Sequence, residues 1–260
     1  MSDVVQLDTT KPNIARVYDY MLGGKDNFAA DRELAERMCA IDPGLPALAR
    51  ANRDFLTAAV RRAAQAGIGQ FLDLGAGLPT GPAVHHTARE VNEAARVAYV
   101  DNDPVVVNHA SALLTDRPGV AAAAADLARP GEVLAHPAVA SLIDPGEPVC
   151  VILASVLHFT DPQTAGEVVT GYASRVAAGS WIVVSVGTTD DAQLLDRARG
   201  SYTLSAWNHG PREMAAWLAG LTLAPPGMSE ARRWISQVGG VPRANEGSWY
   251  ILCAAAVKPG

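Results

Sequence analysis

The residues best suited to chemistry begin with a glycine-rich turn, FLDLGAGLPT at positions 71–80. An apolar run that predicts a buried strand enters this turn, and a helix is expected to follow it. Gly75 and Gly77 carry no Cβ, so a ligand can lie against the backbone from Gly75 through Ala76 to Gly77. The alternative is a plain connector, because short Gly-x-Gly turns often join a strand to a helix.

The residue types around this turn bear on which ligand it takes. A dinucleotide-binding turn needs a third glycine at position 80, where this chain has Thr80. Asp73, just before the glycines, would repel a pyrophosphate and suits a cationic group, such as the amino group of a methionine moiety. The turn therefore favours a ligand other than a dinucleotide.

Acidic residues follow the next two predicted strands. Asp101 ends the second strand, where a carboxylate can accept hydrogen bonds from ribose hydroxyls, and Asn102 follows it. Asp103 is better explained as the N-cap of the next helix. After the third strand come Asp126 and Leu127, where the acid can accept a bond from the amino group of an adenine or serve as a turn residue.

The fourth predicted strand runs into Ser155 and, three residues later, His158. In an open α/β sheet the carboxyl ends of the strands face the ligand crevice, so both side chains are expected near the reacting group. A histidine with a pKa near ~6.5 can remove a proton from a hydroxyl or an amine, which makes His158 the candidate catalytic base. Alternatively, His158 caps its loop or packs beside an adenine. His209 is a second candidate for lining an acceptor pocket.

A polar segment near the N-terminus concentrates hydrogen-bonding and aromatic groups. It contains Tyr18, Gly24, Lys25, Asp26 and Asn27, and its paired glycines break any helix. The segment is either a plain loop or a lid over a bound ligand. In the second interpretation Lys25 pairs with a carboxylate of that ligand.

Hydrophobic periodicity indicates which elements position these residues. Residues 1–69 are expected to form an N-terminal helical extension, with helices over 31–40 and 50–66. Residues 70–260 alternate short apolar strands with helices, which predicts an α/β domain with a doubly wound, mostly parallel sheet. The expected strands are 71–74, 97–100, 120–125, 149–154, 181–186, 221–224 and an antiparallel 249–257. The expected helices of this domain are 81–95, 104–115, 131–141, 163–178, 190–199 and 211–219.

Composition narrows the class of protein. The chain has 260 residues, 49% apolar content and a formal net charge of −6, so nucleic acid is not an expected partner. No apolar run approaches membrane-spanning length, and MSDVVQLDTT has no secretory pattern, so a cytoplasmic protein without membrane contact is expected. The three cysteines are far apart, and no histidine has a partner at metal-ligand spacing, so neither disulfides nor a metal site are expected.

Together these motifs resemble the actinobacterial family of S-adenosylmethionine (SAM)-dependent methyltransferases once catalogued as a domain of unknown function. The resemblance extends from Lys11 to about Val257. It rests on KPNIARVYDYMLGGKDNFAADRELAERM, ARANRDFLTAAVRRA, FLDLGAGLPT, YVDNDPVV, VILASVLHF and WLAGLTLAPPGM.

The resemblance implies a class I fold, with a seven-stranded Rossmann-like sheet and SAM at the carboxyl ends of strands one and two. It implies that Asp73, Gly75 and Gly77 hold the methionine part, Asp101 the ribose and Asp126 the adenine. The expected reaction transfers the methyl group to a small acceptor and releases S-adenosylhomocysteine (SAH). Two alternatives are a SAM-binding regulatory protein without transfer activity and an NAD(P)-dependent oxidoreductase, against which Asp73 and Thr80 count.

Overall fold

The computed structural model describes residues 8–114, 118–201, 206–243 and 247–260. In these residues eight strands form one sheet in the order β3-β2-β1-β4-β5-β8-β6, with β7 also paired to β8. The strands from β1 to β5 pair in parallel, and β8 runs antiparallel to β5. Their bounds are β1 Gln70–Leu74, β2 Arg96–Asp101, β3 Val120–Ala124, β4 Cys150–Ala154, β5 Trp181–Thr188, β6 Thr222–Leu223, β7 Ser229–Glu230 and β8 Tyr250–Val257.

The predicted doubly wound α/β fold is confirmed, with one strand more than the seven expected. The additional strand is the two-residue β7, which pairs with β8 through Ser229 and Cys253. A strand of two residues is too short to show alternating apolar and polar residues in the sequence. It forms because its backbone pairs with β8.

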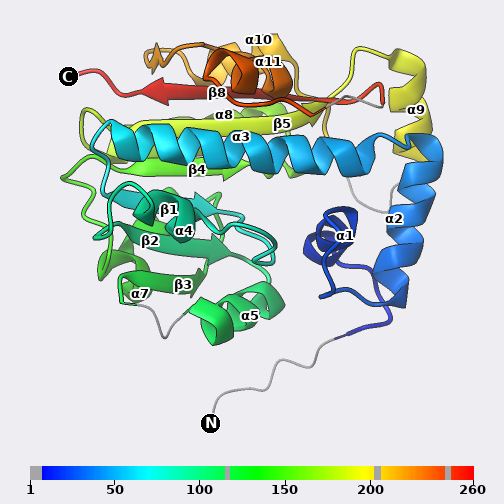
Figure 1. The fold of residues 1–260 in the computed structure, drawn as a ribbon, viewed down its shortest axis with the longest axis horizontal. Coiled ribbons are helices and arrows are strands. Elements are labelled where there is room, and N and C mark those ends of the chain that lie inside the picture. Colours follow the sequence, from blue (N-terminus) through cyan, green and yellow to red (C-terminus); the bar gives the residue numbers. More distant parts are fainter. Residues whose placement is uncertain (1–7, 115–117, 202–205, 244–246) are drawn as a thin grey trace.

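Helices cover both faces of the sheet (Figure 1). One face packs against α3, α4 and α11, and the other against α8 and α10, because successive strand residues point to opposite sides. The helices are α1 Ile14–Met21, α2 Ala29–Ile41, α3 Leu45–Gln65, α4 Val84–Arg89, α5 Pro104–Leu114, α6 Pro130–Ala135, α7 Pro137–Ala140, α8 Pro162–Arg175, α9 Ala192–Ser201, α10 Pro211–Trp217 and α11 Ala231–Gln237.

Some helix predictions were wrong in extent. The helix expected over 81–95 is the six-residue α4, and the one expected over 131–141 is divided into α6 and α7. Pro137 explains the division, because proline disfavours helical backbone in the residue before it. Helix α11 has no counterpart among the predicted elements, and its Trp234 is fully buried against Phe55 of α3.

The segment expected to be loop or lid contains a helix, α1. Asn13 caps it by accepting hydrogen bonds from the amides of Ala15 and Arg16, at 2.9 and 3.2 Å. Helices α1 and α2 and the start of α3 share a small apolar cluster of their own, which includes Val17 and Leu34. Figure 1 shows α1 beside the end of the sheet toward which the β2 and β3 arrows point, so the extension lies at the carboxyl edge of the parallel strands.

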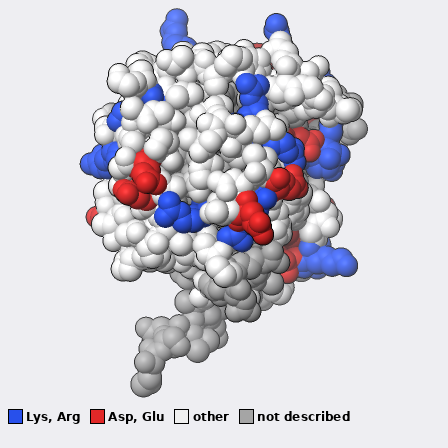
Figure 2. Space-filling view, turned by 60° about the vertical axis from the view of Figure 1, so that its left-hand side comes forward, with Lys and Arg blue, Asp and Glu red and all other residues white. Residues whose placement is uncertain are grey.

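Charge is dispersed on the face shown in Figure 2, where basic and acidic side chains are interspersed instead of forming one basic patch. Among the described helices, none is both long and apolar enough to cross a bilayer.

Candidate functional site

The candidate site begins where β1 and β2 end side by side. Leu74 pairs with Val100 at the last position of the ladder. The Val100 carbonyl then accepts bonds from the amides of Gly75 and Ala76, at 2.8 and 3.2 Å. The glycine turn therefore folds back over the end of β2 and brings its backbone next to Asp101.

The two glycines of the turn have different roles. Both have positive φ, 66° at Gly75 and 62° at Gly77. A Cβ on Gly75 would lie 3.0 Å from the Cβ of Val156 and closer still to its Cγ2, so Gly75 is needed for packing on the loop after β4. A Cβ on Gly77 would meet no heavy atom within 4 Å, so the space at Gly77 is open to a ligand.

The carboxylate of Asp101 is held beside this open space. Its Oδ2 accepts a hydrogen bond from the Gly77 amide at 3.0 Å, and its Oδ1 accepts one from the Asp103 amide at 2.9 Å. Burial raises the pKa of Asp101, and these two bonds oppose the increase. Each carboxylate oxygen retains a second lone pair, so Asp101 can accept further bonds from a diol.

A small pocket lies at the turn. Its lining combines the residues of the glycine turn with one basic, one acidic and one phenolic side chain from α3, β1 and β2. The lining residues are Arg53, Asp73, Ala76, Gly77, Leu78, Pro79, Ala83, Val84, Tyr99 and Ala110.

The pocket lining contains one acidic and one basic side chain. Asp73 is only 6% exposed, and burial raises its pKa to about 7, with Arg53 opposing the increase and Asp101 adding to it. The Arg53 guanidinium reaches the turn and donates to the carbonyls of Thr80 and Pro82, at 2.7 and 3.2 Å. A wall with one acid and one base suits a zwitterionic amino-acid group.

Sequence reasoning missed Arg53 and Tyr99. Arg53 lies within the predicted amphipathic helix, where a polar residue at the boundary of the apolar face was the only available sign. Tyr99 lies inside β2, and its hydroxyl lies 2.9 Å from Nδ1 of His85 at the start of α4. Burial raises the pKa of Tyr99, so this hydroxyl is protonated at neutral pH.

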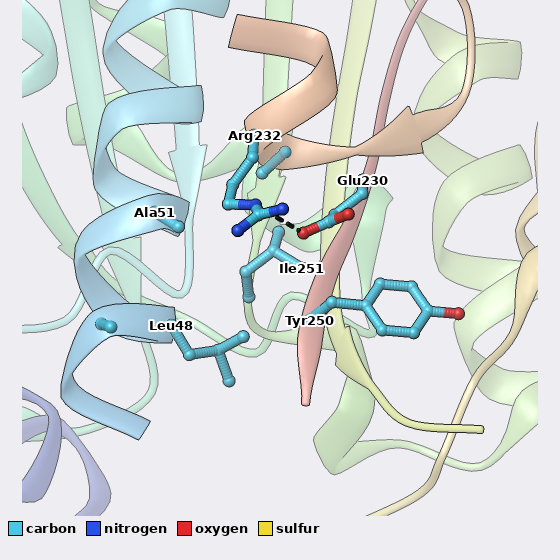
Figure 3. A pocket seen from close by; sticks show the side chains of 8 residues that line it. Leu48, Ala51, Glu230, Arg232, Tyr250 and Ile251 are labelled. Carbon is cyan, nitrogen blue, oxygen red and sulfur yellow. Dashed lines mark ion pairs between the residues drawn. The ribbon is translucent and has the colours of Figure 1, made fainter. Parts of the chain in front are cut away.

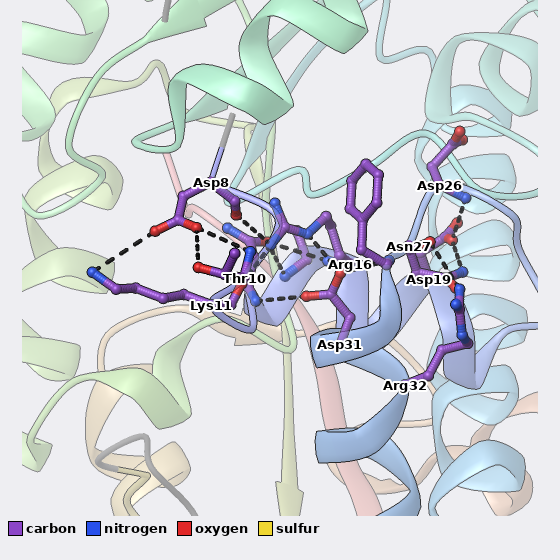
Figure 4. Close-up of polar contacts among 12 residues, drawn as sticks. Asp8, Thr10, Lys11, Arg16, Asp19, Asp26, Asn27, Asp31 and Arg32 are labelled. Carbon is purple, nitrogen blue, oxygen red and sulfur yellow. Dashed lines mark hydrogen bonds and ion pairs between the residues drawn. The ribbon is translucent and has the colours of Figure 1, made fainter. Parts of the chain in front are cut away.

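Three of the predicted residues, Gly24, Asp26 and Asn27, lie around the carboxylate of Asp19, which sequence reasoning also missed; Figure 4 shows Asp26 and Asn27 beside it. Asp19 is 2% exposed and accepts bonds from the Asp26 amide and from Asn27 Nδ2, both at 2.9 Å. Gly24 lies against the same carboxylate, which leaves no room for a Cβ. Lys25 is exposed on this loop.

The N-terminal segment is tied to the loops after β1 and β2, two of the loops that carry predicted ligand residues. Thr80 donates to Asp19 Oδ1 at 2.7 Å, and Asn13 donates through Nδ2 to the carboxylate of Asp103. A buried ion pair between Arg16 and Asp31, 2.7 Å apart, holds α1 against α2. The segment thus bridges the loops after β1 and β2, next to the pocket.

The fourth strand ends in a strained turn. Ser155 has a φ of 55°, unusual for a residue with a side chain, and its amide donates to the Ser185 carbonyl at 2.9 Å. His158 is half-buried, and its Nδ1 has no hydrogen-bond partner among the described residues. Burial lowers the pKa of His158 to about 4, with a contribution from His209, so the imidazole is neutral at pH 7.

Four other candidates lie nearer the surface or deeper in the protein than expected. Asn102 and Asp126 are exposed, and Asp126 accepts the Ala128 amide at 2.9 Å, which fits the turn-residue alternative. Leu127 packs toward Gly75 and is half-buried. His209 has no exposed surface, because it packs on Trp217 with ring centroids 4.9 Å apart, so the expectation that it lines an open pocket was wrong.

A second hollow lies between α3, β7 and β8 (Figure 3). Its two charged residues, Glu230 and Arg232, form an ion pair of 3.0 Å, and Leu48, Ala51 and Ile251 supply apolar walls. Because its charges pair with each other, this hollow offers a ligand little unpaired charge.

The two glycines allow a direct test of the open space. Gly77→Ala is expected to cost about 1–2 kcal/mol of stability for its left-handed backbone, yet to weaken SAM binding strongly, since the new methyl group enters the ligand space. Gly75→Ala adds a collision with Val156 and is expected to lower the melting temperature more. Thermal unfolding and calorimetric titration with SAM measure the two effects; equal SAM affinity in Gly77→Ala and wild type would show that the space holds no ligand.

Comparison with known proteins places the chain in a family. The sequence matches the S-adenosyl methyltransferase family over residues 2–259. No match was found among curated proteins. A DUF574 family protein from Streptomyces avermitilis is similar at 34% identity and a TM-score of 0.88, over 98% of this chain and 100% of the other. A candidate methyltransferase from Thermobifida fusca is similar at 36% identity and a TM-score of 0.88, over 100% of both chains.

A more distant structure shares the fold. Magnesium protoporphyrin IX methyltransferase from Synechocystis, crystallised with SAH, matches at a TM-score of 0.52 and 14% identity, over 93% of each chain. Both near relatives come from actinobacteria, and the family decides against the regulatory and oxidoreductase alternatives. The chain belongs to the S-adenosyl methyltransferase family: it is a SAM-dependent methyltransferase, with SAM as its methyl donor and SAH as its product.

Proposed function

We propose that the protein methylates a small molecule and binds SAM in the pocket between the glycine turn, α3 and β2. The observation that carries this proposal is that Asp73 and Arg53 line the same pocket, which also includes Gly77 with its open space. The α-ammonium and α-carboxylate of a methionine moiety present the complementary pair of charges. The charged groups of this pocket thus fit the amino-acid end of SAM.

The remaining groups follow from this orientation. Asp73 receives the ammonium, Arg53 the carboxylate, and the free lone pairs of Asp101 the ribose hydroxyls. Leu127 lies beside Gly75 and supplies an apolar contact for the adenine, with Asp126 at its edge. Lys25, predicted for the carboxylate, is exposed, and Arg53 takes that role because it lies in the pocket.

SAM supplies a methyl group on a sulfonium, so the protein has mainly to orient the acceptor and exclude water. Ser155 and His158 stand at the carboxyl end of β4, where the acceptor would lie. The neutral imidazole of His158 can take the acceptor's proton, and its buried Nδ1, unpartnered among the described residues, is available for that bond. A small acceptor fits this arrangement, because the N-terminal segment closes over the adjacent loops.

We further propose that residues 1–69 and 70–260 act as one structural unit, in which the extension covers the cofactor. Its bonds to Thr80 and Asp103 support this arrangement, since they join the extension to the loops after β1 and β2.

Calorimetric titration tests the orientation of the ligand. Wild-type protein is expected to bind SAM and SAH at micromolar concentration and NAD not at all. Arg53→Met is expected to weaken SAM and SAH binding at least tenfold, which corresponds to about 1.4 kcal/mol and is typical for loss of a charged hydrogen bond. Binding of methylthioadenosine, which lacks the amino-acid group, should not change.

Arg61→Met on the same helix is the matched control, because Arg61 pairs with Glu90 at the surface. An Arg53→Met protein that lost methylthioadenosine affinity as much as SAM affinity would place the amino-acid end elsewhere.

A further inference from the structure

A continuous series of hydrogen bonds crosses the interior from α1 to the end of β4. The Ser155 amide donates to Ser185 Oγ at 3.0 Å, and the Ser185 hydroxyl donates to Asn52 Oδ1 at 2.6 Å. Asn52 Nδ2 then donates to the Tyr18 hydroxyl at 2.9 Å, and Tyr18 donates to the Ala49 carbonyl at 3.1 Å. Each group donates one hydrogen bond to the next group in the series, and all of these bonds run from Ser155 toward Ala49.

The two central members are shielded from water. Asn52 and Ser185 are 3% and 0% exposed, and burial raises the pKa of Tyr18, so its hydroxyl stays protonated. A buried polar group without a partner costs about 1–3 kcal/mol. Moving one side chain of the series away from the next would leave such a group, so the side chains keep their relative positions. Asn52 suits the centre because its amide both accepts and donates.

The series ends at the strained residue of the site. A residue with a side chain keeps a positive φ only where its surroundings determine it, and the Ser185 hydroxyl supplies one of the two acceptors of the Ser155 amide. The next residue, Val156, fills the space beside Gly75. The position of α1 is therefore connected to the loop after β4 and, through it, to the glycine turn.

We infer that Asn52 is a positioning residue that couples the N-terminal helix, through Tyr18, to the turn at Ser155. The role of Tyr18 is then to end this series and not to contact the cofactor. An effect of this coupling on the affinity for SAM rests on the proposed function, whereas the coupling itself does not depend on where SAM binds.

Tyr18→Phe tests the coupling with Tyr20→Phe as its matched control. Both variants remove one hydroxyl from α1, but the Tyr20 hydroxyl bonds the exposed Glu36, at 3.2 Å. The amide resonance of Ser155 in nitrogen-15 spectra is expected to shift in Tyr18→Phe and to stay in place in Tyr20→Phe. A Ser155 resonance that moved in neither variant, or equally in both, would overturn the inference.

SAM titration of the same two variants separates the coupling from the proposed function. Tyr18→Phe is expected to raise the SAM Kd several-fold, and Tyr20→Phe to leave it unchanged. Absence of SAM binding in wild-type protein would count against the proposed site alone, since the Ser155 comparison needs no ligand.

Asn52→Asp supplies a second test that depends on pH. A protonated carboxyl accepts and donates like the amide, whereas a carboxylate only accepts. Among the described residues, the side chains that bond Asn52 are the hydroxyls of Tyr18 and Ser185, and the Arg53 charge acts on the same Tyr18 hydroxyl. The Ser155 amide shift of this variant is compared with that of wild type at the same pH. The two shifts are expected to agree at acid pH, where the carboxyl is protonated, and to differ increasingly as the carboxyl ionises. A constant difference across pH would contradict a role for the amide donor.

Discussion

Wild-type protein is expected to bind SAM about tenfold more weakly at pH 6 than at pH 8, whereas Asp73→Asn should show no such difference. The pKa of Asp73 is raised to about 7 in the free protein, chiefly by burial. In the proposed orientation the α-ammonium binds the Asp73 carboxylate, so below pH 7 the ligand must displace a proton, and affinity falls about tenfold per pH unit. Titration calorimetry in buffers of different ionisation enthalpy measures both the affinity and the proton released.

The Asp73 carboxyl has the opposite effect on folding stability: SAM affinity is expected to rise with pH, whereas the contribution of this group to the free energy of unfolding falls. An unfolded Asp73 loses its proton near its ordinary pKa of 3.8 but the folded one only near 7, so the folded state binds more protons between these values. Stability from this group is therefore present at low pH and is lost as pH rises through about 4 to 7. Asp73→Asn removes the penalty, and at pH 8 it is expected to melt at a higher temperature than wild type while binding SAM more weakly.

Two results would contradict this assignment. The first is a SAM affinity that is independent of pH in wild type, and the second is a pH dependence that persists in Asp73→Asn. His158 does not confuse the comparison, because its pKa is lowered to about 4 and the imidazole stays neutral throughout this range.

Asp101→Ala is expected to weaken SAM binding by about 2–3 kcal/mol, roughly 30- to 150-fold, while the protein still folds. The carboxylate is fixed by the Gly77 and Asp103 amides and lies beside the open space at Gly77, so it is ready to accept bonds from the ribose. Calorimetric titration with SAM and with methylthioadenosine should show the same loss, because both ligands carry the ribose.

Asp103→Asn is the matched control for this variant. Asp103 accepts the Val105 amide at 2.8 Å and so caps α5, and an asparagine keeps that cap. SAM affinity in Asp103→Asn should equal that of wild type. Unchanged affinity in Asp101→Ala would remove the ribose assignment and, with it, the proposed orientation of the cofactor.

The secondary structure that carries the site was largely predictable from the sequence. The strands β1, β2, β4, β5 and β8 are largely buried on both faces, and such strands have continuous apolar sequences that predict them; β3 has an equally apolar sequence but is partly exposed. Asp73, the Gly75–Gly77 turn, Asp101 and Ser155 lie at strand ends, and parallel strands bring such ends to one edge. These predictions depend only on neighbours in the sequence.

Other features were decided by tertiary structure. Nothing near Arg53 in the sequence places it in the pocket, and its position follows from how α3 lies across the sheet. Asp19 meets Thr80 across 61 positions, and Asn52 meets Ser185 across 133. Local patterns determine which backbone forms and which face is apolar. Which polar side chains then meet depends on strand order and on the rotation of each helix about its axis, and these are settled only when the whole core packs.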